Sequence, residues 1–165
     1  MKNKEFFCHE LCKKCRGECC KTSGCALNAD INFERVLTRK MILDILNTGL
    51  IKISKDKYTE ILYLSIRNKN DEEYGECMLL SDSGCMFDDN LRPMGGVMLI
   101  PKYDENKKKY MCHNDLEKEN LLIESWSTYQ EYILYAWKHK KNIRITTKEE
   151  LEYRFNELKE LMTKV

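Results

Sequence analysis

The chain has 165 residues, of which 42% are hydrophobic and 33% charged, and its formal net charge is +1. This length accommodates one compact domain and leaves little room for a second. A net charge near zero gives no global attraction to nucleic acid or to an anionic membrane, so we expect neither as a partner. No window approaches the roughly 20 consecutive apolar residues that span a bilayer, so we expect no membrane segment.

The first residues of the chain are mostly charged or polar and lack the apolar stretch of a signal peptide. We therefore expect a cytoplasmic protein, in which thiols stay reduced. This expectation decides how the nine cysteines are interpreted. In a reducing compartment, clustered cysteines indicate metal binding or catalysis, and an odd number of them does not suit a complete disulfide framework.

Residues 8–30 hold most of the cysteines, together with glycines and short polar residues. The spacing is Cys12-x2-Cys15-x3-Cys19-Cys20-x4-Cys25, and no apolar period defines a helix or a strand. We expect an irregular segment that a metal orders.

The next elements are a helix and two strands. The helix is predicted from about Thr38 to about Asn47, because apolar residues recur there at helical spacing, and Gly49 stands just beyond it, where a left-handed cap is easiest. Residues 50–53 and 61–66 are rich in β-branched and aromatic side chains and are predicted strands. Residues 68–73 are polar and predict a loop.

A hairpin and a further strand pair are predicted after this loop. Two short apolar runs, 77–80 and 85–87, flank the turn signal Ser81-Asp82-Ser83-Gly84, which is typical of a β-hairpin. This hairpin would bring Cys77 and Cys85 close together near its open end. Residues 96–100 and 109–112 predict another strand pair, which places Cys112 on the last strand.

The pattern changes to helix from Asp115 onward. A first apolar stripe of helical period is followed by a break at residues 142–146, and Thr147 with Glu150 then forms a capping-box pair at the start of a second helix. The two stripes consist of Leu122, Trp126, Tyr129, Ile133 and Trp137, and of Leu151, Phe155, Leu158 and Met162. We expect an antiparallel helical hairpin that packs on the sheet or on a partner.

Together these elements predict a single α+β domain over residues 1–165. Its metal-binding part, residues 8–114, would combine the cysteine-rich segment with a small, mainly antiparallel sheet. Residues 115–165 would form the C-terminal helical hairpin.

Eight of the nine cysteines are predicted metal ligands. Thiolates are soft ligands that hold zinc tetrahedrally or anchor iron–sulfur clusters, and a C-x2-C step lets two sulfurs reach one metal. An iron–sulfur cluster is favoured because the thiols exceed what one zinc ion needs, and zinc, in one or two four-sulfur sites, is the alternative. The side chains of the adjacent Cys19 and Cys20 diverge, so one of them would ligate while the other packs or serves a second site. The predicted ligands are Cys12, Cys15, Cys19, Cys20, Cys25, Cys77, Cys85 and Cys112.

These motifs carry a family resemblance. The run Cys12-Lys13-Lys14-Cys15-Arg16-Gly17-Glu18-Cys19-Cys20, followed by Gly24-Cys25 and by Cys77 to Gly84-Cys85, resembles the YkgJ-like zinc- or iron-chelating cysteine-cluster family. The resemblance extends to Arg92-Pro93, Pro101 and Cys112, and loosely to Trp126-Ser127-Thr128-Tyr129-Gln130. It implies a small bacterial domain that chelates zinc or an iron–sulfur cluster, related to a module of flagellin lysine N-methylases. Many members carry a cysteine soon after Arg-Pro, where this chain has Met94-Gly95-Gly96, and Cys112 would take its place.

Whether the chain is an enzyme stays open. No G-x-G-x-x-G element follows a strand and no P-loop is present, so a methyl donor has no recognisable nucleotide-binding element. The alternatives to a metal-binding protein are a cluster-dependent enzyme of methyl or sulfur transfer and a zinc-stabilised interaction module that binds a protein partner through its C-terminal helices. The module would expose an apolar face around Trp126, Trp137 or the last helix.

Overall fold

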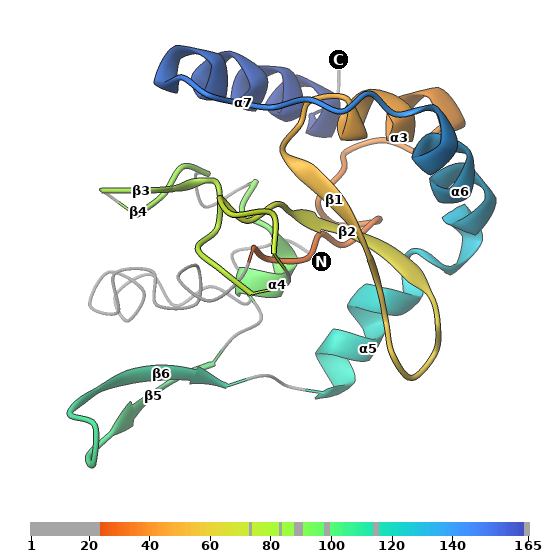
Figure 1. The fold of residues 1–165 in the computed structure, drawn as a ribbon. Helices are drawn as coiled ribbons and strands as arrows, with labels where there is room; N and C mark the ends of the chain where they lie inside the picture. The colour runs from red at the N-terminus through yellow and green to blue at the C-terminus, as the bar shows by residue number, and fades with distance from the viewer. Residues whose placement is uncertain are drawn as a thin grey trace.

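The computed structural model describes residues 24–72, 74–82, 84–87, 91–97, 100–113 and 116–163, with the backbone alone for 96–97, 100–102, 109–113 and 116. The elements in chain order are α3 (Arg39–Leu46), β1 (Ile51–Lys55), β2 (Leu62–Ile66), β3 (Leu80–Ser81), β4 (Gly84–Cys85), α4 (Met94–Val97), β5 (Ile100–Asp104), β6 (Lys109–His113), α5 (Leu116–Glu124), the 3-10 helix η2 (Ser127–Tyr129), α6 (Gln130–His139) and α7 (Lys148–Met162). This mixture of helices and short antiparallel strands confirms the α+β class (Figure 1).

The strands of the described residues form three separate two-stranded ladders: β1–β2, β3–β4 and β5–β6. All three are antiparallel; in β1–β2 the register runs from Ile51 opposite Ile66 to Lys55 opposite Leu62. The antiparallel pairing agrees with the prediction. Its division into three ladders differs from the single small sheet that the sequence suggests.

Two of the predicted strands need correction. The β3–β4 hairpin is short, with Leu80 opposite Cys85, and Cys77 pairs instead with Asn68 on the chain that follows β2. The strand predicted at 96–100 is wrong, because residues 94–97 form the helical turn α4 and β5 begins only at Ile100. Long-range contacts fix that turn: the Gly95 N–H donates to the carbonyl oxygen of Ala26 at 2.8 Å.

The helix α3 forms where its local signals place it. Thr38 is the N-cap, and its hydroxyl accepts a hydrogen bond from the Met41 N–H at 3.2 Å. Ile42 and Ile45 face the core and are fully buried. Gly49 has a φ of +79°, so the predicted left-handed glycine after the helix is confirmed.

The aromatic stripe does not lie on one helix. The chain leaves helix after Glu124, passes through η2 and resumes at Gln130. Trp126 is fully buried at this break, where its Nε1–H donates to the carbonyl oxygen of Leu27 at 2.7 Å. Trp137 near the end of α6 is 57% exposed, so the stripe leaves the core before its last member.

The two C-terminal helices share α3 as their packing partner. α3 packs extensively against α6 and to a lesser extent against α7, and the coil of residues 140–146 separates α6 from α7. Figure 1 shows the three helices together at one end of the molecule, with β1 and β2 beside them. The predicted cap of α7 is confirmed, since the Thr147 hydroxyl accepts from the Glu150 N–H at 3.1 Å. The structure therefore differs from the predicted two-helix hairpin: α6 and α7 both pack against α3.

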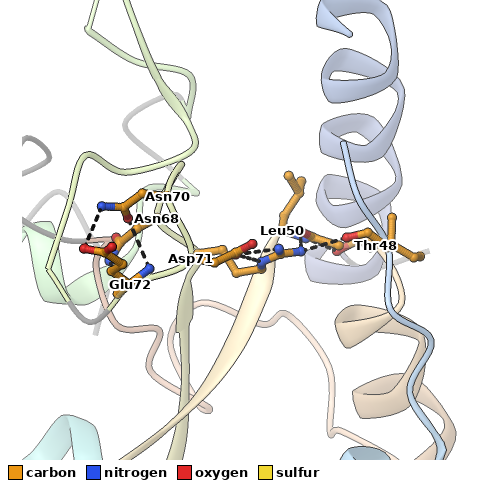
Figure 2. Close-up of polar contacts among 9 residues, drawn as sticks. Thr48, Leu50, Asn68, Asn70, Asp71 and Glu72 are labelled. Carbon is orange, nitrogen blue, oxygen red and sulfur yellow. Dashed lines mark hydrogen bonds and ion pairs between the residues drawn. The ribbon is translucent and has the colours of Figure 1, made fainter. Parts of the chain in front are cut away.

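Arg67, just after β2, ties the strands to this helical layer. Its Nη1 donates to the carbonyl oxygens of Gly49 at 2.7 Å and of Ile143 at 3.0 Å, and its Nε donates to Asp71 Oδ1 at 3.0 Å. Figure 2 shows Asp71 next to the chain at Thr48 and Leu50. The end of β2 is thus fixed relative to α3 and to the coil before α7.

Within the described residues, no helix has both the length and the apolar character needed to cross a bilayer.

Candidate metal centre

Cys25 lies on a short extended segment that runs along β2. The Ile66 N–H donates to the carbonyl oxygen of Cys25 at 3.0 Å, and the Leu27 N–H donates to that of Leu64 at 2.9 Å. Gly24 permits this approach, because a Cβ at its position would lie 1.9 Å from the carbonyl oxygen of Ile66. Only glycine brings the backbone so close to the strand.

Cys77 lies on the chain that pairs with the continuation of β2. The Lys69 N–H donates to the carbonyl oxygen of Glu76 at 2.8 Å and the Met78 N–H donates to that of Arg67 at 2.9 Å, so Cys77 stands opposite Asn68. The side chain of Cys77 is only 4% exposed. Cys25 therefore lies beside β2, and Cys77 lies beside the residues that continue β2.

Cys85 reaches the same region from β4. The Met86 N–H donates to the carbonyl oxygen of Leu79 at 3.0 Å, which holds the end of the hairpin beside the chain that carries Cys77. The hairpin thus brings Cys85 toward Cys77 as predicted, although the paired part is shorter.

The three cysteines line one small cavity of about 10 Å³. This volume is about that of one water-sized sphere. The lining surface is apolar, and the other residues that contribute to it are Ile66, Leu79, Phe87, Arg92 and Pro93. Cysteines from three separate segments therefore line a common space.

Asn32 fixes the wall formed by Arg92 and Pro93. Its Nδ2 donates to the carbonyl oxygen of Arg92 at 3.0 Å, and its Oδ1 accepts from the Met94 N–H at 3.0 Å. Asn32 is 2% exposed, so both bonds are made away from solvent, where a lost partner costs about 1–3 kcal/mol. One buried amide therefore spans the Arg-Pro pair and holds it in place.

The remaining predicted ligands are placed less completely. Cys12, Cys15, Cys19 and Cys20 lie outside the described residues. Cys112 lies on β6 opposite Pro101, and only its backbone is described. Among the side chains that the structure describes, no three from His, Cys, Asp and Glu lie close enough together to hold a metal ion. The three cysteines share a cavity, and a metal would have to draw them together or use further ligands.

A larger groove of about 710 Å³ lies elsewhere, between α3, α7 and the coil before α7. The positive and negative charges of its lining residues are equal in number: the cations are Arg35, Lys141 and Arg154, and the anions are Asp44, Glu157 and Glu160. Two of these anions are paired with cations: Asp44 with Lys40 at 2.8 Å and Glu157 with Arg154 at 3.6 Å. No cysteine lines this groove among the described residues, so the cysteine cavity is the stronger candidate.

Two buried asparagines near the cavity are not predicted from the sequence. Asn68 lies in a stretch whose polar composition predicts a loop, and no sequence pattern marks Asn32. Their amides bond to residues 44 and 62 positions away along the chain, and no local pattern records such contacts.

Comparison of the chain with protein-family models, with curated proteins and with solved structures finds no match.

Proposed function

We propose that this chain binds a metal centre, an iron–sulfur cluster or zinc, through cysteine thiolates. The observation that supports the proposal is the shared cavity of Cys25, Cys77 and Cys85. Thiolates suit both kinds of centre. Further ligands in this proposal are Cys12, Cys15, Cys19 and Cys20, which precede Cys25 in the sequence, and Cys112.

Two observations bear on the kind of metal and point in opposite directions. The cavity of about 10 Å³ suits a single ion better than a cluster with bridging sulfides, for which the walls would have to move apart. Eight predicted ligands, however, exceed the four thiolates that one structural zinc ion takes. The proposal therefore includes both forms, and metal analysis separates them.

A structural role is favoured over catalysis. Zinc sites that are closed by protein ligands are structural, whereas catalytic ones keep an open position for water or substrate. The support for a structural role is the small volume of the cavity that the described cysteines line, about 10 Å³. A cluster-dependent enzyme of methyl or sulfur transfer is thus the less favoured form of the proposal.

Membership of the YkgJ-like family and a cytoplasmic location belong to the same proposal. Support for the family is the combination of Cys12-x2-Cys15, Cys19-Cys20 and Gly24-Cys25 with the later hairpin. Support for the location is chemical, because thiolate ligands persist where thiols are kept reduced.

Oxygen-free purification of the full chain, followed by elemental analysis and a visible spectrum, tests this proposal. Zinc without iron, and without visible absorbance, would identify the zinc form. Iron with acid-labile sulfide and broad visible absorbance would identify the cluster. A protein that folds and contains neither metal in stoichiometric amount would contradict the proposal.

A second candidate function is an interaction module for a protein partner, favoured by the outer side of α6. Trp137 and Leu134 are 57% and 45% exposed and lie three residues apart, so they adjoin on the helix surface. Exposed tryptophans are common anchors of protein interfaces. A protein retained by the immobilised wild-type chain should be lost with Trp137→Ala and kept with Tyr153→Ala, an exposed aromatic of α7. Equal retention by both variants would contradict this function.

A further inference from the structure

The side chain of Asn68 bonds to the backbone of Gly24, next to Cys25, and to the backbone of Glu72 in the turn after β2. Its Oδ1 accepts from the Gly24 N–H at 2.7 Å, and its Nδ2 donates to the carbonyl oxygen of Glu72 at 2.7 Å. We call these two bonds the Asn68 clamp; Figure 2 shows Asn68 and Glu72 side by side. Asn68 is 1% exposed, whereas Gly24 is half-buried and Glu72 is exposed, so both bonds are partly shielded from water.

The clamp connects the segments of two proposed ligands. Gly24 directly precedes Cys25, and the backbone of Asn68 forms the bridge to Cys77. One residue therefore holds the Cys25 segment with its side chain and the Cys77 segment with its main chain. Gly24 is also where the cysteine-rich part of the sequence, residues 12–20, leads into the described fold.

The chemistry of the clamp requires an amide. The Gly24 N–H needs an acceptor and the Glu72 carbonyl needs a donor, and asparagine supplies both from one short side chain. A buried group that loses its partner costs about 1–3 kcal/mol. An apolar residue at position 68 would therefore favour separation of residues 24–25 from the extension of β2, with which the Cys77 segment pairs.

We propose that Asn68 is the positioning residue of the metal centre, setting the separation of Cys25 and Cys77 through its side-chain bond to Gly24 and its backbone bridge to Cys77. The inference rests on the proposed function. Residues that orient metal ligands without touching the metal typically change metal affinity by about 10- to 100-fold when they are replaced. The same magnitude is expected for loss of the Asn68 clamp.

The test measures the affinity of the reduced full-length chain for Zn²⁺, by competition with a chelator, in three variants. Asn68→Ala removes both bonds and should weaken binding about 10- to 100-fold. Asn68→Asp keeps an oxygen that accepts from Gly24 but loses the donor to the Glu72 carbonyl and buries a charge, so it should also bind more weakly than the wild-type chain. Asn70→Ala is the matched control, because Asn70 is exposed and its bonds stay within the same turn, for example from the Glu72 N–H at 3.2 Å. Equal affinities of Asn68→Ala and Asn70→Ala would overturn the inference.

A second measurement needs no variant and so does not depend on whether Asn68→Ala folds. Metal binding and the clamp favour the same arrangement, so addition of Zn²⁺ to the wild-type chain should slow hydrogen exchange of the Gly24 amide. Exchange of this amide at an unprotected rate, with and without Zn²⁺, would also overturn the inference.

The outcomes separate this inference from the function on which it rests. A wild-type chain that binds neither zinc nor iron would refute the proposed function and the positioning role together. A wild-type chain that binds metal while Asn68→Ala binds equally well would refute the positioning role alone.

Discussion

Replacement of Trp126 by phenylalanine should destabilise the fold by about 2–4 kcal/mol. The indole is fully buried, and its Nε1–H donates to the carbonyl oxygen of Leu27, two residues beyond Cys25. Phenylalanine can keep the edge-on contacts with Phe33 and Tyr129, whose ring centroids each lie 6.0 Å away, but it has no donor. The Leu27 carbonyl oxygen would lose its donor, which costs about 1–3 kcal/mol. The volume left by the smaller ring adds about 1 kcal/mol.

Urea unfolding followed by circular dichroism, with chelator present throughout, measures this loss independently of metal. Trp137→Phe is the matched control, because Trp137 is the chain's other tryptophan and is 57% exposed. Its substitution should change the free energy of unfolding by less than about 0.5 kcal/mol. Equal effects of the two substitutions would refute the idea that Trp126 anchors the Cys25 segment to the helices.

Two further predictions concern the Cys25 segment and the turn between β1 and β2. Gly24→Ala should weaken zinc binding and lower the Tm, because its Cβ would stand 1.9 Å from the Ile66 carbonyl oxygen, a backbone atom that cannot rotate away; wild-type values of both would contradict the geometry. Thr59→Ala should raise the pKa of Asp56 toward its ordinary 3.8 in an NMR titration, because the side-chain and backbone hydrogen bonds from Thr59 hold that pKa low. The stabilisation from this carboxylate is complete above its unfolded pKa and is lost as the pH falls through the lowered folded value. The variant should therefore lose less stability over that acidic range, and an unchanged Asp56 pKa would refute the assignment.

The parts of the fold that sequence could predict are those with local causes. Thr38 and Thr147 cap their helices through the N–H three residues on, and the apolar spacing behind each cap defines the buried face. The failures have distant causes. The turn at 94–97 replaces a predicted strand because Ala26 and Asn32 bond to it from far along the chain, and tertiary contacts of this kind override local propensity.

The candidate site divides in the same way. The convergence of Cys77 and Cys85 follows from a turn signal between two short apolar runs, which is local information. The addition of Cys25 follows from the idea that one metal collects many thiols. The role of Asn68 could not be predicted, because a polar residue after a strand is typical of loops and its partner Gly24 is 44 positions away.

The central claim is that cysteines of the shared cavity bind the metal, and the metal-to-protein ratio of two cysteine variants tests it most directly. Cys77→Ala removes a thiol of the cavity, and Cys8→Ala removes the only cysteine that is not a predicted ligand. After oxygen-free purification, we predict stoichiometric zinc or iron in the wild-type chain and in Cys8→Ala, and a large loss in Cys77→Ala. Metal at the wild-type ratio in Cys77→Ala, or no metal in the wild-type chain, would contradict the claim.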